Sequence, residues 1–184
     1  SANEVRAAER VLERAGAAPH LPLWCGIETP RGVLAAPEIA SATPRVACLV
    51  MGTSDLVKDL RARHTPGRTE LLTSLSWVVL AARANGLAAL DGVHLDLGDD
   101  AGFEAACRQG RDLGFDGKTL IHPRTIDAAN AIFAPTAAEV AAARRVVEAH
   151  AEAEAAGRGV TVVEGRLVEA LHVAEARRIL ALAE

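Results

Sequence analysis

Val46-Ala47-Cys48-Leu49-Val50-Met51 is an uninterrupted apolar run, and Gly52-Thr53-Ser54-Asp55 follows it and ends in a carboxylate. Leu21–Ile27 is a second such run, and Glu28 comes directly after it. Apolar runs of this kind, bounded by Gly and Pro, are typical of strands covered on both faces, as in a parallel α/β sheet. Ligands of these sheets bind at the carboxyl ends of the strands. Two acids at neighbouring strand ends therefore predict a site for a hard cation, with magnesium as the best fit.

Helical and strand patterns alternate on both sides of these two runs. A capping box, Ser1-x-x-Glu4, opens a helix that ends at Gly16. Further helices are expected at 35–41, after Asp55, at 69–85 and at 100–113, with strands at 87–95 and 115–121. This alternation predicts a parallel sheet with crossover helices. An open doubly wound sheet is the alternative, although no G-x-G-x-x-G or P-loop sequence follows any strand.

The pattern changes after His122. A helix is expected at 124–132, and the capping box Thr136-x-x-Glu139 opens an alanine-rich helix that ends at Gly157. A short hairpin at 160–168 and a last amphipathic helix follow. We therefore expect two parts: residues 1–133, which hold the parallel sheet, and residues 134–184, a helix-hairpin-helix extension that packs on the domain or on another subunit.

Composition excludes several function classes. The chain has 184 residues, long enough for one domain with a core, and half of them are apolar. A net charge of −4, the lack of tyrosine and the lack of a basic run argue against a nucleic-acid partner. No apolar stretch approaches the roughly 18 residues of a membrane span, and no signal peptide is visible at residue 1. Three scattered cysteines are typical of reduced thiols in a cytoplasmic protein.

Each acid also has a simpler interpretation when it is taken alone. Glu28 fits a loop or capping acid, and Asp55 fits the first turn of a helix, where the macrodipole favours negative charge. Taken together they favour a metal site, because two carboxylates leave coordination positions for water and a chelating substrate. The small residues Gly52, Thr53 and Ser54 can present backbone N–H groups to a substrate carboxylate.

Later polar residues allow two interpretations each. The acids Asp91, Asp96, Asp99 and Asp100 fit loop and helix-capping roles as well as a site role. Lys118 fits either a lysine that binds an anionic phosphate or a surface lysine. His122 precedes Pro123, which fixes the local turn, and it fits either a structural or a ligand-binding histidine.

Six motifs occur along the chain in a fixed order: Ile27–Val33, Gly52-x-x-Asp55-Leu56-x-x-Asp59-Leu60, Leu90–Val93, Gly114–Pro123, Phe133-x-Pro135-Thr136 and Glu164–Glu169. In this order they resemble the citrate lyase beta subunit-like branch of the aldolase/citrate lyase family, which includes the malyl-CoA lyases. The resemblance covers essentially the whole chain, and the six motifs together are more specific than any one of them.

The resemblance implies a TIM (β/α)₈ barrel and magnesium-dependent carbon-carbon bond cleavage or condensation of a short acyl-CoA, of the citryl-CoA or malyl-CoA type, with a small 2-oxo acid. The magnesium ligands of the family fall on Glu28 and Asp55. The backbone of Gly52, Thr53 and Ser54 would hold the carboxylate of the 2-oxo acid. The segment Ile121, His122 and Pro123 would lie near the CoA moiety.

The chain departs from the family pattern in two places. The first four barrel strands and their substrate-binding arginine are absent, so the sequence resembles the last four βα units plus a C-terminal helical extension. We expect either a trimmed chain or a half-barrel that pairs with another chain, because half a barrel exposes two sheet edges. In the lyases a catalytic Asp of the extension reaches a neighbouring subunit's site, which implies a homo-oligomer, a dimer or trimer. Glu169 stands at the matching position, where it fits a catalytic acid or base or else an exposed acid in the first turn of the last helix.

Three rival functions stay open. The same scaffold is compatible with hydrolysis of a CoA thioester by an activated water, and with a class II pyruvate aldolase that does not use CoA. The C-terminal extension favours the branch that uses CoA. A third possibility, from another class, is a non-catalytic chain that binds the metal but lacks the substrate-binding half of the barrel.

Overall fold

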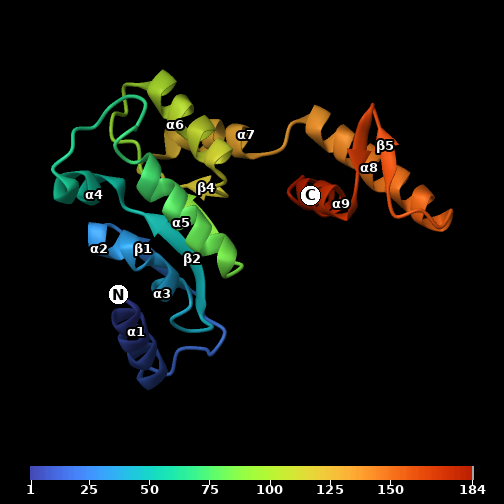
Figure 1. Cartoon of the computed structure of the whole chain (residues 1–184). Coiled ribbons are helices and arrows are strands. Elements are labelled where there is room, and N and C mark those ends of the chain that lie inside the picture. Colours follow the sequence, from blue (N-terminus) through green and yellow to red (C-terminus); the bar gives the residue numbers. More distant parts are fainter. Residues whose placement is uncertain (184) are drawn as a thin grey trace. The chain divides into compact units, whose positions relative to one another are not determined.

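A computed structural model describes residues 1–183 of the chain, which divides into two compact units, Ser1–Phe133 and Ala134–Glu184 (Figure 1). The first unit contains a parallel sheet whose strands lie side by side in chain order: β1 (Leu23–Ile27), β2 (Val46–Met51), β3 (Ala88–Asp91) and β4 (Gly117–Lys118). The α/β class with a parallel sheet, predicted from the apolar runs, is confirmed. Closure of this sheet into an eight-stranded barrel stays a prediction.

The register of the sheet aligns the strand ends. Ile27 pairs with Met51, so the next residues, Glu28 and Gly52, leave the sheet at the same level. β3 ends at Asp91 and does not continue to residue 95 as predicted, because the Gly92 N–H donates to the Asp91 carboxylate rather than to a neighbouring strand. β4 likewise covers only two residues of the predicted strand 115–121.

Helices connect the strands in the first unit. They are α1 (Ala2–Arg14), α2 (Pro30–Leu34), α3 (Ala36–Ala40), α4 (Thr53–Leu60), α5 (Leu72–Ala84), α6 (Asp100–Leu113), the 3₁₀ turn η1 (Pro123–Thr125) and α7 (Ile126–Phe133). The helix predicted at 35–41 is confirmed as α3, and the short helix α2 precedes it; each of the two has a proline in its first turn. Helix α4 begins at Thr53, so Asp55 lies in its first turn rather than at its start.

The core lies between the sheet and the helices that cover it. Helix α5 crosses the sheet (Figure 1) and buries Leu75, Val78 and Ala82 against Leu49 and Met51 of β2. A smaller cluster joins α6 to α7 through Phe103, Cys107 and Ala129. These two clusters fix the sheet, and they therefore fix the positions at which its strands end.

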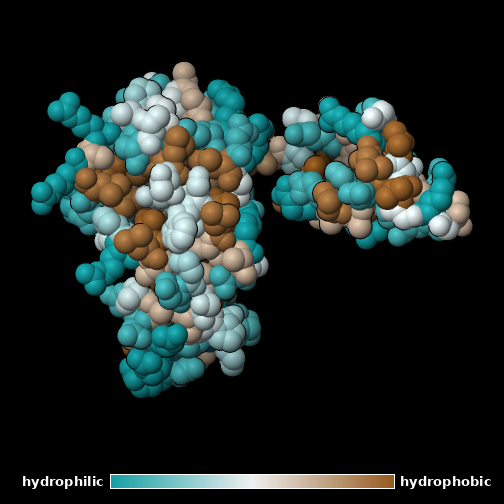
Figure 2. Space-filling model, in the orientation of Figure 1, coloured by the Kyte–Doolittle hydropathy of each residue, from teal (hydrophilic) through white to brown (hydrophobic). Residues whose placement is uncertain are grey.

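Strand β1 has a free edge in the part of the chain that the structure describes, since it pairs with β2 alone. Trp24 of this strand is 64% exposed. Figure 2 shows further apolar side chains on the visible face of the first unit, and the exposed large apolar residues of this unit include Leu34, Leu80 and Ile121. An unpaired, apolar strand edge is suited to pairing with further strands.

The second unit is a helix, a hairpin and a helix: α8 (Ala137–Ala155), β5 (Thr161–Val163), β6 (Arg166–Val168) and α9 (Ala170–Ala181). Helix α8 opens with the predicted capping box, in which the Glu139 N–H donates to Thr136 Oγ1 and the Thr136 N–H donates to Glu139 Oε2. Within residues 1–183, no helix combines the length and the apolar character that crossing a membrane requires.

Candidate functional site

Glu28 and Gly52 lie against each other where β1 and β2 end. A Cβ added to Gly52 would lie 2.2 Å from Glu28 Cγ and 2.8 Å from Glu28 Oε1, so the Glu28 side chain fills the space that any other residue at 52 would occupy. The Gly52 N–H donates to the Ile27 carbonyl at 2.9 Å and holds the two strand ends together. Glycine at 52 is thus required by the close approach of Glu28, not by its φ.

Asp55 projects from the first turn of α4, three residues after Gly52. Its side chain is 62% exposed, and its Oδ1 lies 3.5 Å from Lys58 Nζ. Glu28 is also exposed. Both side chains face solvent, so a cation can reach them without the cost of burying a charge.

These two acids fit the donor set that magnesium prefers, namely carboxylate oxygens with remaining positions open to water. Within residues 1–183, no group of three or more His, Cys, Asp and Glu side chains is placed to hold a metal. A cation at Glu28 and Asp55 would therefore take its other ligands from water and substrate. The arrangement fits the predicted metal site, and the assignment of the two ligands stays a prediction.

The turn between β2 and α4 offers backbone donors beside Glu28. Thr53, Ser54 and Asp55 form the first turn of α4, and the N–H groups of a first turn lack an acceptor within the helix. Such groups, at the positive end of the helix dipole, bind carboxylates and phosphates. The predicted role of Gly52, Thr53 and Ser54 in holding a substrate carboxylate is compatible with this geometry and stays a prediction.

The end of β3 packs onto the same turn. A Cβ added to Gly92 would lie 2.5 Å from Thr53 Oγ1 and 2.9 Å from the Met51 carbonyl oxygen. Thr53 itself is only 4% exposed, because Gly92 covers it. The ends of β1, β2 and β3 therefore pack side by side, with Glu28 against Gly52 and Thr53 against Gly92.

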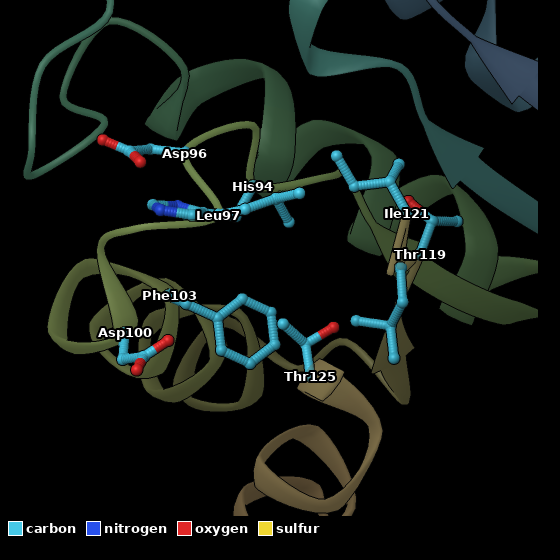
Figure 3. Close-up of a pocket in the computed structure, with 9 residues that line it drawn as sticks. His94, Asp96, Leu97, Asp100, Phe103, Thr119, Ile121 and Thr125 are labelled. Atoms are coloured by element: carbon cyan, nitrogen blue, oxygen red, sulfur yellow. The ribbon is translucent and has the colours of Figure 1, made fainter. Parts of the chain in front are cut away.

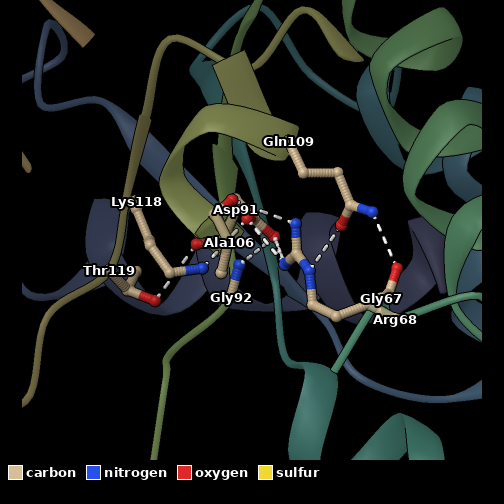
Figure 4. A network of polar contacts seen from close by, with 8 residues as sticks. All are labelled: Gly67, Arg68, Asp91, Gly92, Ala106, Gln109, Lys118 and Thr119. Atoms are coloured by element: carbon tan, nitrogen blue, oxygen red, sulfur yellow. Dashed lines mark hydrogen bonds and ion pairs between the residues drawn. The ribbon is translucent and has the colours of Figure 1, made fainter. Parts of the chain in front are cut away.

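Directly before Gly92, Asp91 is the centre of a buried charge cluster (Figure 4). The Asp91 carboxylate is fully buried and accepts from Arg68 NH1 at 2.7 Å and from Lys118 Nζ at 2.9 Å. Burial lowers the pKa of the Lys118 amino group below its usual range, and the Asp91 carboxylate opposes that shift. The surface-lysine interpretation is therefore wrong, because the amino group is buried against Asp91, and this burial gives no support to the phosphate-binding interpretation.

The end of β4 contributes a small pocket and an exposed segment. The side chains of His94, Phe103 and Thr125 surround the pocket (Figure 3), and the ring centroids of His94 and Phe103 lie 6.0 Å apart, edge to face. His94 Nε2 is buried there and has no hydrogen-bond partner in the described residues. This pocket could not be predicted from the sequence, because its lining residues come from separate segments of the chain. Asp96 and Leu97 lie with His94 in the loop after β3, Asp100 lies with Phe103 in α6, and Thr119, Leu120 and Ile121 follow β4.

His122 has a fixed orientation beside this pocket. Its Nδ1 accepts the Arg124 N–H at 3.2 Å, so the neutral ring carries its proton on Nε2. Ile121 is 52% exposed, and Pro123 starts the 3₁₀ turn. His122 is therefore an oriented, exposed donor, which suits a phosphate or carbonyl oxygen; the predicted CoA contact of Ile121, His122 and Pro123 stays a prediction.

Glu169 lies in the second unit, at the N-terminus of α9. Its side chain is partly exposed, and its N–H donates to His172 Nδ1 at 3.1 Å. Glu169 is therefore the residue that precedes the first turn of α9, whereas the simpler interpretation from the sequence was an exposed acid within that turn. The catalytic role of Glu169 stays a prediction.

The environments of the three cysteines disfavour a reactive thiolate. Cys25, Cys48 and Cys107 are all free of disulfides, and burial raises the pKa of each thiol above its usual range. A neutral, buried thiol is a poor nucleophile. The predicted assignment of the three as reduced thiols is compatible with this environment.

Known proteins are similar to this chain in sequence and in fold. The pattern of the HpcH/HpaI aldolase/citrate lyase family matches residues 1–123. A (3S)-malyl-CoA thioesterase of Cereibacter sphaeroides ATCC 17023 is 51% identical over 166 residues, which are 90% of this chain and 58% of that protein. The citrate lyase subunit beta of Escherichia coli K12 is 41% identical over 162 residues, which are 88% of this chain and 54% of that protein.

Among solved structures, the protein CitE of Mycobacterium tuberculosis, in complex with magnesium, acetoacetate and coenzyme A, has a TM-score of 0.75 and 32% identity. The similarity covers 88% of this chain and 61% of that one. The chain thus spans less than two thirds of the length of the relatives it matches. On its sequence and its parallel α/β fold, the chain belongs to the HpcH/HpaI aldolase/citrate lyase family.

Proposed function

We propose that the chain carries the metal-binding part of a magnesium-dependent enzyme that acts on short acyl-CoA thioesters of the citryl-CoA or malyl-CoA type. The packing of the Glu28 side chain over Gly52 carries this proposal, because it sets a carboxylate beside the backbone donors of the β2–α4 turn. The CitE structure, a complex with magnesium, acetoacetate and coenzyme A, supports the proposed classes of ligand.

Glu28 and Asp55 would hold the magnesium ion. When bound, the ion supplies Lewis acidity that polarises the 2-oxo oxygen of the small acid. The N–H groups of Thr53, Ser54 and Asp55 would orient the acid's carboxylate, and water would fill the other positions. His122 would donate its Nε2 proton to an oxygen of the CoA moiety, beside Ile121 and Pro123.

Carbon-carbon bond cleavage is the first candidate reaction. The bond between the hydroxyl-bearing carbon and the carbon next to the thioester breaks, the hydroxyl gives up its proton, and the released enolate takes a proton at carbon. These transfers need a positioned acid or base. Glu169, supplied by a partner subunit of a homo-oligomer, is the proposed group.

The four parallel strands would form part of a (β/α)₈ barrel, with residues 134–184 as its C-terminal extension. The free apolar edge of β1, with Trp24 exposed on it, is where further strands of that barrel would pair. The substrate arginine expected from the family resemblance would come from those strands.

Thioester hydrolysis is the second candidate, and the malyl-CoA thioesterases favour it, since they share more identity with the chain than the citrate lyase subunit does. In that reaction water attacks the thioester carbonyl, the C–S bond breaks, and the products are a free acid and a free CoA thiol. A chain that binds magnesium without catalysis is the third outcome.

Product analysis distinguishes the three. The 184-residue chain is incubated with malyl-CoA or citryl-CoA, with and without Mg²⁺, and free thiol and 2-oxo acid are measured separately. A lyase releases 2-oxo acid and acetyl-CoA without free thiol, whereas a thioesterase releases free thiol without 2-oxo acid. If neither product forms while Mg²⁺ binds, the catalytic proposal is wrong for this chain and the non-catalytic alternative stands.

A further inference from the structure

The buried carboxylate of Asp91 joins four separate segments of the first unit (Figure 4). It accepts from Arg68 of the loop before α5, from Lys118 of β4 and from the N–H of Gly92, at 2.7, 2.9 and 2.7 Å. Arg68 in turn donates to the side chain of Gln109 and to the carbonyl of Ala106, both in α6. One side chain thus fastens a loop, two strands and a helix.

Filling part of the core with this ion cluster carries a large desolvation penalty. It buries two positive charges and one negative charge, and the desolvation of such groups often exceeds their mutual attraction. Apolar residues of similar volume would stabilise the same space at least as well. What the ion cluster provides instead is a defined position for Asp91, since Arg68 and Lys118 can both bond to its carboxylate in only one geometry.

The position of Asp91 first determines the position of the β2–α4 turn. With its Oδ1 on the Gly92 N–H, Asp91 fixes the Gly92 backbone. Gly92 in turn packs against Thr53 at a distance that leaves no room even for a methyl group. The position of Thr53, and with it the first turn of α4 that carries Asp55, therefore depends on Asp91.

The position of Asp91 also determines the course of the chain at the end of β4. The carbonyl oxygen of Asp91 accepts both the N–H of Thr119, at 3.0 Å, and its hydroxyl, at 3.2 Å. Thr119 lines the pocket at this strand end and stands two residues before Ile121. The same residue therefore sets the course of the chain into the exposed segment that contains His122.

We infer that Asp91 is a positioning residue, held by Arg68 and Lys118, that fixes the turn 52–55 and the segment 119–123 relative to each other. The naming of these two as substrate-binding segments rests on the proposed function. Asp91 does not itself reach either ligand, because its carboxylate is fully buried.

The test compares Asp91→Asn with Asp116→Asn, a matched change at the opposite end of the same strands. Asp116 precedes β4, pairs with Arg83 at 2.8 Å and accepts the Ala89 N–H at 2.8 Å. Amide chemical shifts and the dissociation constant for Mg²⁺ are measured for both variants and for the unchanged chain. We expect Asp91→Asn to shift the amides of 52–56 and 119–123 and to weaken Mg²⁺ binding about tenfold or more. Asp116→Asn leaves both unchanged.

The outcomes separate this inference from the proposed function. If folded Asp91→Asn leaves the amides of 52–56 in place, or if Asp116→Asn shifts them equally, the positioning role is wrong. If the unchanged chain binds no Mg²⁺ while Asp91→Asn shifts those amides, the positioning role holds and the proposed function fails.

Should Asp91→Asn not fold, Gly92→Ala provides the second variant. It keeps the three charged side chains and inserts a methyl group against Thr53. The inference requires shifts at 53–56 in this variant too, and unchanged shifts there overturn it.

Discussion

Two aspartates fasten β3 to β4, one at each end of the strands. Asp116, at the amino end, pairs with Arg83, and these side chains are 37% and 43% exposed. Asp91, at the carboxyl end, pairs with Arg68 and Lys118, and the Asp91 and Lys118 side chains are fully buried. The residue types are alike, and the difference lies in their access to water.

The exposed Asp116 pair therefore only holds the strands together, whereas the buried Asp91 cluster also fixes the position of its neighbours. Water screens the Asp116 pair, so it can rearrange at little cost. The Asp91 cluster cannot rearrange without leaving a charge unpaired in the interior. The buried end is the one whose next residue, Gly92, packs on Thr53, in agreement with the general placement of ligand sites at the carboxyl ends of parallel strands.

Removing each carboxylate should produce the largest difference in unfolding free energy between the two ends. Asp91→Ala leaves Lys118 buried without its partner and Arg68 without its ion pair, and should cost about 3–5 kcal/mol of unfolding free energy. Asp116→Ala should cost only about 1 kcal/mol, because its ion pair is exposed. Urea unfolding followed by tryptophan fluorescence measures both, since Trp24 and Trp77 lie in the first unit. Equal losses would show that burial does not distinguish the two ends.

The next prediction isolates the role of Asp91 from the total charge. Lys118→Met removes one cation but leaves Asp91 paired with Arg68 and bonded to the Gly92 N–H. We expect a loss of about 1–2 kcal/mol, well below that of Asp91→Ala, because no buried charge is left unpaired. The same urea experiment measures it, and a loss as large as that of Asp91→Ala would contradict the central place given to the carboxylate.

Of this carboxyl end, the strand-end acids could be predicted from the sequence. Glu28 and Asp55 follow long apolar runs, and parallel strands bring such ends together wherever the sheet twists or closes. The parallel α/β class follows from the same runs. Packing of Glu28 over Gly52 adds a contact that no single-residue pattern contains.

The Asp91 cluster could not be predicted from the sequence. Lys118 belongs to a strand of two residues, too short for any alternation to show which face it takes. Arg68 comes from a loop and reaches Asp91 in a left-handed backbone conformation, with φ of 50°. Pairing among these three residues depends on the register of β3 with β4, which only the assembled sheet defines.

A smaller effect on stability is expected at the proposed metal site. Gly52→Ala pushes a methyl group into the Glu28 side chain, which is exposed and can swing away. We expect a stability loss of about 1 kcal/mol but about tenfold weaker Mg²⁺ binding, as the carboxylate leaves its position. Gly159→Ala, where a Cβ meets nothing within 4 Å, is the control for added methyl groups. Unchanged Mg²⁺ affinity in Gly52→Ala would argue against Glu28 as a ligand.

The smallest expected effect is a pH dependence that only the buried end should show. The pKa of Lys118 is lower in the folded chain than in the unfolded chain. Between these two values, below about pH 10.5, the unfolded state binds more protons, so stability contributed by this group rises with pH. The stability difference between the unchanged chain and Lys118→Met should therefore shift in favour of the unchanged chain as pH rises through the alkaline range. A flat difference would indicate an ordinary Lys118 pKa.

The assignment of Glu28 and Asp55 as magnesium ligands is tested most directly by calorimetric titration of Mg²⁺ into the chain and three variants. Glu28→Gln and Asp55→Asn each remove one proposed ligand, whereas Asp59→Asn removes an acid of the same helix, near Lys58, that is not a proposed ligand. We predict that the unchanged chain and Asp59→Asn bind Mg²⁺ alike, and that the other two bind it at least about tenfold more weakly. Equal Mg²⁺ affinity in all four proteins would contradict the assignment.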